Sequence, residues 1–190
     1  SLIKNTSVNL AHYYSSCCGQ DVFRKIFEAY ESFLHQNRLI DFDDMLVYCK
    51  ELLVQRPDIL AAWQRKYQYI LIDEFQDINQ IQYDIIRMLA APQDNLFIVG
   101  DDDQSIYKFR GANIRNILDF EKVFPDAKVV KLEQNYRSTQ NILNAANGVI
   151  ANNRGRKEKA LWTENEQGEP ILFQQFQNGY EEAEYVSGEI

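Results

Sequence analysis

The chain has 190 residues, 45% of them hydrophobic and 13% aromatic, which is enough to bury the core of one domain, or of one domain and part of another. It contains no apolar run of the roughly 20 residues that a membrane helix needs, and its N-terminus does not resemble a signal peptide, so we expect no membrane partner. The net charge of −8 has the wrong sign for binding DNA by charge alone, so any DNA contact has to be local or made by stacking.

The cysteines do not have the spacing of a disulfide framework or a zinc site. There are three, and two of them are adjacent: Cys17, Cys18 and Cys49. We therefore expect free thiols and a cytoplasmic protein.

The first third of the chain is predicted to be helical. Within residues 21–39, apolar side chains form one helical stripe: Phe23, Ile26, Phe27, Tyr30, Phe33 and Leu34. A second helix is predicted to begin at Asp41, whose carboxylate can cap the first turn. Its expected inward residues are Phe42, Met45, Leu46, Cys49, Leu52 and Leu53. Pro57 interrupts this pattern, and a short third helix follows.

The pattern then changes to that of a β-α-β unit. Residues 69–72 and 96–99 are uninterrupted apolar runs, typical of parallel strands that are buried on both faces. Between them, apolar residues from Ile78 to Leu89 recur at helical spacing, which indicates a crossover helix. A further helix over 114–124 and a third strand at 129–132 are predicted to follow.

The last part of the chain repeats this alternation. A helix is predicted to begin at Ser138 or Thr139, a strand at 171–173 and a final helix near Tyr180. A basic loop lies between the first two of these elements and has Arg154, Arg156, Lys157 and Lys159. Because the helical pattern is still running at Ile190, we expect both ends to be cut from a longer protein.

Polar clusters follow the two strands of the β-α-β unit, at residues 73–77 and 100–104. Ligands of open parallel sheets bind at the carboxyl ends of the strands. There Asp73 can hold Mg²⁺, Glu74 can polarise the water that attacks a γ-phosphate, and Gln104 can hydrogen-bond that water or the phosphate. The alternative is that the acids only cap the next helix.

Two further segments carry candidate binding residues, each with a simpler alternative. If 105–111 is extended, Tyr107 and Phe109 share one face for stacking on bases, with Arg110 near phosphates; otherwise they are a packed aromatic pair. Tyr136 can stack on a nucleotide base, and Arg137 can reach a phosphate. These two residues are also compatible with a capped helix start and a surface arginine. Similarly, the basic loop is compatible with either DNA contact or solvation.

Three segments together resemble motifs II, III and IV of the UvrD/PcrA/Rep group of helicases. They are Ile72–Asp77, Val99–Ala112 and Leu132–Thr139, with further similarity at 41–45 and 161–165. The resemblance implies an α/β fold: a partial RecA-like parallel sheet of the P-loop NTPase type, an N-terminal helical segment and the start of a second RecA-like domain. The expected divisions are a helical segment over 1–64, the back half of the first motor domain over 65–134 and a truncated second domain over 135–190.

The resemblance also implies an ATP-dependent helicase that moves 3′ to 5′ on single-stranded DNA, with ATP and Mg²⁺ as cofactors. It makes Asp73 the Mg²⁺ partner and Glu74 the general base, and it has Gln104 and Arg137 contact the γ-phosphate. Tyr136 would stack on adenine, and the DNA-facing residues would be Tyr107, Phe109 and Arg110. The implied partners are single-stranded DNA, duplex junctions and repair or replication proteins.

Two departures from the family pattern qualify this interpretation. Phe109 stands where relatives commonly have Trp, so the ring offers less stacking area and no N–H. The sequence also contains no G-x-x-x-x-G-K-[ST] loop, which the family requires upstream, so we expect the chain alone to be inactive.

Two other classes of function remain open from the residues themselves. A two-metal nuclease could use Asp73, Glu74, Asp101 and Asp103. A non-catalytic interaction module would use the same acids only as helix caps.

Overall fold

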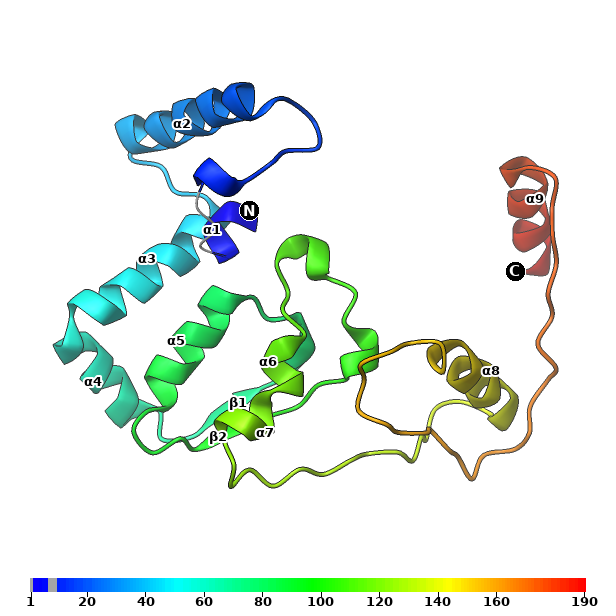
Figure 1. Cartoon of the computed structure of the whole chain (residues 1–190). Helices are drawn as coiled ribbons and strands as arrows, with labels where there is room; N and C mark the ends of the chain where they lie inside the picture. Colours follow the sequence, from blue (N-terminus) through cyan, green and yellow to red (C-terminus); the bar gives the residue numbers. More distant parts are fainter. Residues whose placement is uncertain (1, 7–9) are drawn as a thin grey trace. The chain divides into compact units, whose positions relative to one another are not determined.

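The computed structural model describes residues 2–6 and 10–190, without the side chains of Leu2, Thr6 and Arg110. The chain divides into two compact units, Ser1–Ala127 and Lys128–Ile190 (Figure 1). The division expected from the sequence lies after residue 134, within the second of these units.

The first unit begins with helices. They are α1 (Leu2–Thr6), the 3₁₀ turn η1 (Leu10–His12), α2 (Gln20–Asn37), α3 (Phe42–Gln55) and α4 (Pro57–Lys66). The last three match the helices predicted from the apolar spacing. In space, α3 packs on α1, α4 and the later helix α5.

Local chemistry explains where α3 and α4 start. The Asp41 carboxylate accepts from the Asp44 backbone N–H at 2.8 Å, and the Asp44 carboxylate accepts from the Asp41 N–H at 3.1 Å. This reciprocal pair is a capping box, and it confirms the predicted helix start. Pro57 occupies the first turn of α4, where its missing N–H leaves no hydrogen bond unmade.

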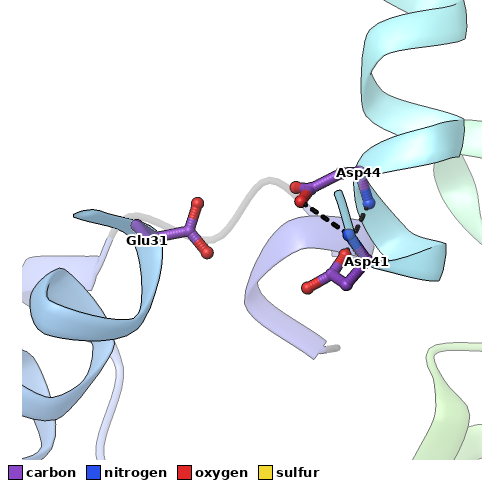
Figure 2. A group of neighbouring side chains, drawn as sticks. All are labelled: Glu31, Asp41 and Asp44. Atoms are coloured by element: carbon purple, nitrogen blue, oxygen red, sulfur yellow. Dashed lines mark hydrogen bonds between the residues drawn. The ribbon is translucent and has the colours of Figure 1, made fainter. Parts of the chain in front are cut away.

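A lysine joins the N-terminal helix to the next two. Lys4 Nζ lies 2.6 Å from Asp44, 2.8 Å from Glu31 and 2.9 Å from Asp41, and its side chain is only 9% exposed. Figure 2 shows the three carboxylates, which come from α2 and from the start of α3. Their oxygens are close enough together to hold a metal ion, but the Lys4 ammonium occupies the space between them. We refer to these four residues as the Lys4 cluster.

The predicted β-α-β unit is present. Strands β1 (Ile70–Ile72) and β2 (Leu96–Ile98) pair in parallel with Ile72 opposite Ile98, and α5 (Gln80–Ala90) connects them. Asn79 and Gln82 form a second capping box at the start of α5. The described residues thus form a two-stranded parallel sheet with its crossover helix, which is consistent with part of a RecA-like domain.

The segment after β2 consists of short turns. These are η3 (Asp102–Gln104), η4 (Lys108–Arg110), α6 (Arg115–Leu118) and α7 (Phe120–Val123). The continuous helix predicted over 114–124 is therefore wrong. The helix is interrupted at Asp119, which is the C-cap of α6 and the N-cap of α7.

This break places a phenylalanine in the core of the unit. Phe75, Ile78 and Phe120 form the buried cluster, and the rings of Phe75 and Phe120 meet edge to face with centroids 5.8 Å apart. Partly buried residues from both strands, α5 and α6 surround them. The core thus begins at Phe75, three residues after β1 ends at Ile72.

The second unit has α8 (Gln140–Ile150) and α9 (Gly179–Glu189). The strands predicted at 129–132 and 171–173 are wrong, because both segments lie outside any strand and most of their apolar residues are exposed. Among the described residues of the second unit, one isolated β-bridge is present, and it joins Gln134 to Trp162 in parallel. A strand requires a partner over several residues, and in the described chain these segments have none.

Most of the apolar stripes expected to face inward are exposed. In α2 only Leu34 is buried, and in α3 the buried apolar residue is Leu53. In α8, Leu143 is buried whereas Val149 is exposed. In the described part of the chain, no helix has the length and apolar character needed to cross a membrane.

Candidate functional site

The carboxyl end of β1 turns sharply at Glu74. This residue has φ 50° and ψ 42°, in the left-handed region that non-glycine residues rarely adopt. Asp73 supports the turn, because its Oδ1 accepts from the Glu74 N–H at 2.9 Å. Both carboxylates are exposed at the end of the strand. An uncommon backbone conformation here is typical of a functional site.

A buried glutamine connects this turn to the end of β2. Gln76 is 1% exposed, and its Nε2 donates to Glu74 Oε2 at 2.7 Å. Its Oε1 accepts from the Asp101 N–H at 3.0 Å. Every polar atom of this amide therefore faces one of the two strand ends.

The loop after β2 extends the network to Gln104. Asp101 Oδ1 accepts from the Asp103 N–H at 3.0 Å, and Asp101 Oδ2 accepts from Gln104 Nε2 at 2.8 Å. The residues Glu74, Gln76, Asp101 and Gln104 thus form one hydrogen-bonded line, which we call the strand-end network. The sequence analysis placed Asp73, Glu74 and Gln104 at neighbouring strand ends, and the structure joins these ends through Gln76 and Asp101.

The acidic residues of the second loop lie close together. One carboxylate oxygen from each of Asp101, Asp102 and Asp103 lies within 4.8 Å of the others. Asp102 is buried, however, and Asp101 uses both oxygens to hold the turn. This arrangement favours a structural role for the three acids.

The aromatic pair lies just after this loop. Tyr107 and Phe109 have ring centroids 6.0 Å apart, and Phe109 is 72% exposed. Residues 108–110 form the 3₁₀ turn η4, so the extended segment on which the shared stacking face depended is not present. The rings still come together. The Arg110 side chain lies outside the described residues.

In the second unit, Asn135 organises the turn that holds Tyr136 and Arg137. Its Oδ1 accepts from the N–H groups of Arg137 and Ser138 at 3.0 and 2.8 Å. Tyr136 is 79% exposed and donates its hydroxyl to Gln134, and Arg137 is exposed. Thr139 is the N-cap of α8, which agrees with one of the two predicted helix starts. Its side chain makes no capping hydrogen bond.

A hollow in the first unit lies away from these residues. It has a volume of about 600 Å³ and is lined at the start of both strands and along α7, by residues such as Tyr69, Asn95, Phe97 and Phe124. None of the candidate site residues lines it. The chemistry of the carboxyl strand ends therefore makes them the better candidate site.

Sequence reasoning assigned no role to Gln76 or Gly100. A Cβ on Gly100 would lie 2.8 Å from Gln76 Oε1, so only glycine lets the amide approach β2 this closely. A glutamine two residues after an Asp-Glu pair was the available signal. Its burial depends on contacts between segments that are distant in the sequence.

Comparisons with known proteins agree with the motif resemblance. Residues 3–125 match the model of the UvrD/REP helicase N-terminal domain, and residues 130–190 match that of the UvrD-like helicase C-terminal domain.

Named relatives cover most of this chain. The ATP-dependent DNA helicase PcrA of Leuconostoc citreum is 46% identical over 171 residues, which are 90% of this chain and 23% of that protein. A probable DNA helicase II homolog of Rickettsia felis is 51% identical over 171 residues, 90% of this chain and 26% of that protein. PcrA of Bacillus subtilis is 48% identical over 169 residues, 89% of this chain and 23% of that protein. The chain spans about a quarter of the length of these curated relatives. With both of its units matched in order, the chain belongs to the UvrD/REP helicase family.

Proposed function

We propose that the protein containing this chain is a DNA-stimulated ATPase that moves 3′ to 5′ along single-stranded DNA and opens duplex junctions. The observation that carries the proposal is the strand-end network, which joins Glu74 to Gln104. Phosphoryl transfer depends chiefly on positioning and on charge stabilisation, and this network fixes an acid and an amide in one place. Family membership and the helicase names of the relatives support the same activity.

The residues after β1 fit a magnesium–nucleotide complex. Asp73 is an exposed carboxylate, the kind of hard oxygen ligand that Mg²⁺ prefers. When bound, Mg²⁺ offsets the negative charge of the triphosphate. In this proposal Glu74 orients the attacking water and accepts its proton, while Gln104 donates a hydrogen bond to the γ-phosphate.

The remaining roles come from the motif resemblance. By it we assign Tyr136 to stacking on adenine and Arg137 to the γ-phosphate, and both side chains are exposed, as these roles require. Tyr107 and Phe109 are assigned to DNA, because aromatic rings stack on bases irrespective of sequence. Arg110 is assigned to the DNA backbone by the motif resemblance. Stacking also suits a chain whose net charge is −8.

A metal-dependent nuclease has less support. It would need Asp101 as a ligand, and both oxygens of that carboxylate hold the turn of η3. An interaction module, in which the acids only cap a helix, does not account for Gln76 donating to Glu74.

The test is Glu74→Gln in the full-length protein. ATP turnover with single-stranded DNA should fall at least about 100-fold, because general-base catalysis contributes roughly 10²- to 10⁴-fold. Nucleotide binding should persist, since the substitution keeps the side-chain shape. Glu28→Gln, at an exposed position on α2, is the matched control and should retain wild-type turnover. Normal turnover in Glu74→Gln would remove Glu74 as the base.

The same phosphate-release assay applies to the 190 residues alone. We propose negligible turnover, because they contain no glycine-rich loop to hold the triphosphate. Repair or replication proteins are the proposed partners of the full-length protein. Its proposed location is the cytoplasm, which is compatible with the free thiols of Cys17, Cys18 and Cys49.

A further inference from the structure

We infer that Gln76 is a positioning residue, which holds the Glu74 carboxylate for catalysis and couples it to the loop that leads to the aromatic pair. This inference rests on the proposed function, in which Glu74 is the general base. The proposed function assigned no role to Gln76, and this inference assigns it one in ATP hydrolysis.

The first support is the way the Gln76 amide is used. Its N–H donates to the Glu74 carboxylate at 2.7 Å, and its carbonyl oxygen accepts the Asp101 N–H at 3.0 Å. A buried amide must satisfy both its donor and its acceptor, and here each partner belongs to a different strand end. Rotating the amide would break both bonds, so its orientation is fixed.

The second support is the fit of the β2 end against this amide. A Cβ on Gly100 would lie 2.8 Å from Gln76 Oε1 and 2.9 Å from Ile117 Cδ1, closer than real Cβ atoms approach such neighbours. The Phe75 N–H also donates to the Val99 carbonyl at 2.9 Å, beside the amide. The loop is therefore held against Gln76 with no room for a side chain at position 100, as well as by the hydrogen bond from the Asp101 N–H.

The third support is a contact of the Gln76 main chain. Its carbonyl oxygen accepts from Ser105 Oγ at 3.4 Å. Residue 76 thus holds the loop at Asp101 through its side chain and at Ser105 through its backbone. Gln104 lies between these two points, and Tyr107 follows two residues after the second.

Three hydrogen bonds therefore couple the position of the Glu74 carboxylate to that of Gln104. A displacement of the carboxylate would displace the Gln76 amide and, through it, the Asp101 backbone. The Asp101 carboxylate in turn accepts from Gln104 Nε2 at 2.8 Å. In the proposed function, Glu74 and Gln104 face the nucleotide while the aromatic pair faces DNA. Gln76 would therefore be needed both for the rate of hydrolysis and for its coupling to movement.

The test compares Gln76→Met with Gln82→Met in the full-length protein. Methionine keeps the length of the side chain but has no amide, and Gln82 is a capping residue of α5 that does not touch Glu74. Gln76→Met should lower kcat for DNA-stimulated ATP hydrolysis by about 10- to 100-fold, with KM for ATP within about 3-fold, because small misplacements of catalytic groups have effects of this size. It should also lower the number of nucleotides travelled per ATP. Gln82→Met should change thermal stability but leave kcat and the number of nucleotides travelled per ATP near their wild-type values.

A second variant tests the same contact in case Gln76→Met folds poorly. Gly100→Ala keeps the amide but pushes against it, and it should lower kcat in the same way. In the double variant the two effects should be less than additive, because both act on one contact.

The inference is overturned if wild type is active while Gln76→Met and Gly100→Ala keep kcat within about 2-fold. It is also overturned if Gln82→Met lowers kcat as much as Gln76→Met does. A wild-type protein without DNA-stimulated ATPase activity would instead refute the proposed function itself.

Discussion

Replacing Lys4 by methionine tests whether the Lys4 cluster holds the N-terminal helix in place. The pKa of the Lys4 ammonium is raised: burial alone would lower it, but hydrogen bonds to Asp44, Glu31 and Asp41 outweigh that effect. The pKa of Asp41 falls to about 2, because the Lys4 and Tyr30 hydrogen bonds and the Asp44 N–H outweigh burial. Lys4→Met would leave three carboxylates facing one another without a cation.

The size of the effect follows from distance and burial. At 2.8 Å and an effective dielectric constant near 20, one contact has a gross Coulomb energy of about 6 kcal/mol, most of which desolvation offsets. Deleting one partner of a buried pair costs about 3–5 kcal/mol. Because the side chains of Asp41 and Glu31 are 24% and 25% exposed, we expect about 3 kcal/mol, the lower end of that range. For a chain of this length, Tm would fall by roughly 6–12 °C.

The assay is urea unfolding followed by Trp63 fluorescence in a Trp162→Phe background, so that the signal comes from the first unit. Lys50→Met is the control, because the Lys50–Asp84 pair at 2.6 Å is about one-third exposed and contributes about 1 kcal/mol or less. Equal losses of stability in the two variants would refute the reasoning.

The pH dependence provides a second check with a defined sign. The pKa of Asp41 is lower in the folded state than its ordinary value of 3.8, so its contribution is present above pH 4 and disappears as pH falls towards 2. Lys4 has a raised pKa, so its contribution is complete below its ordinary value of 10.5. The difference between Lys4→Met and wild type should therefore shrink between pH 4 and pH 2 and stay constant from pH 5 to pH 9.

One further substitution tests the core of the first unit, and another tests a close glycine contact in the second unit. Phe75→Ala removes a ring that is 0% exposed and should cost about 3–5 kcal/mol in urea unfolding, whereas Phe97→Ala, at a 61% exposed ring, should cost about 1 kcal/mol or less; similar losses would contradict the core assignment. Gly168→Ala places a Cβ 2.3 Å from Thr139 Oγ1 at φ +73° and should destabilise the second unit, read by Trp162 fluorescence, by about 2 kcal/mol or more. Gly155→Ala at φ +80° meets nothing within 4 Å and should cost about 1 kcal/mol, so an equal loss at the two glycines would rule out the contact with Thr139 as the cause.

The parts of the fold that sequence predicted are those set by local chemistry. Asp41 begins α3 because its carboxylate reaches an N–H three residues later, a contact that involves only residues close together in the sequence. The apolar run at 70–72 becomes a strand because the run at 96–98 pairs with it across one crossover helix. Residues 129–132 are also mostly apolar, although they include Lys131, but they lack a pairing partner in the described chain. An apolar run alone was therefore insufficient to predict a strand.

The candidate site was predictable in its residue types and less so in its connections. Asp73, Glu74 and Gln104 follow from their places at strand ends. Gln76 does not, because its role depends on the approach of Gly100 from a segment far along the chain. Residues 108–110 form a 3₁₀ turn through local bonds, from the Gly111 N–H to the Lys108 carbonyl and from the Ala112 N–H to the Tyr107 carbonyl. The alternation of aromatic and basic residues in this segment gave no sign of that turn.

A comparison of two polar contacts in the first unit, the Lys4 cluster and the Gln76 amide, shows why an amide occupies position 76. At the Lys4 cluster an ammonium binds three carboxylates, which fixes helices but supplies no acceptor. At position 76 a lysine could bind Glu74 but would leave the Asp101 N–H without a partner. A glutamate could accept from Asp101 but would repel Glu74. Only a neutral side chain with a donor and an acceptor at this length serves both strand ends, and asparagine is one methylene too short to replace it. The strand-end network therefore gives a physical reason for glutamine, rather than lysine, glutamate or asparagine, at this position.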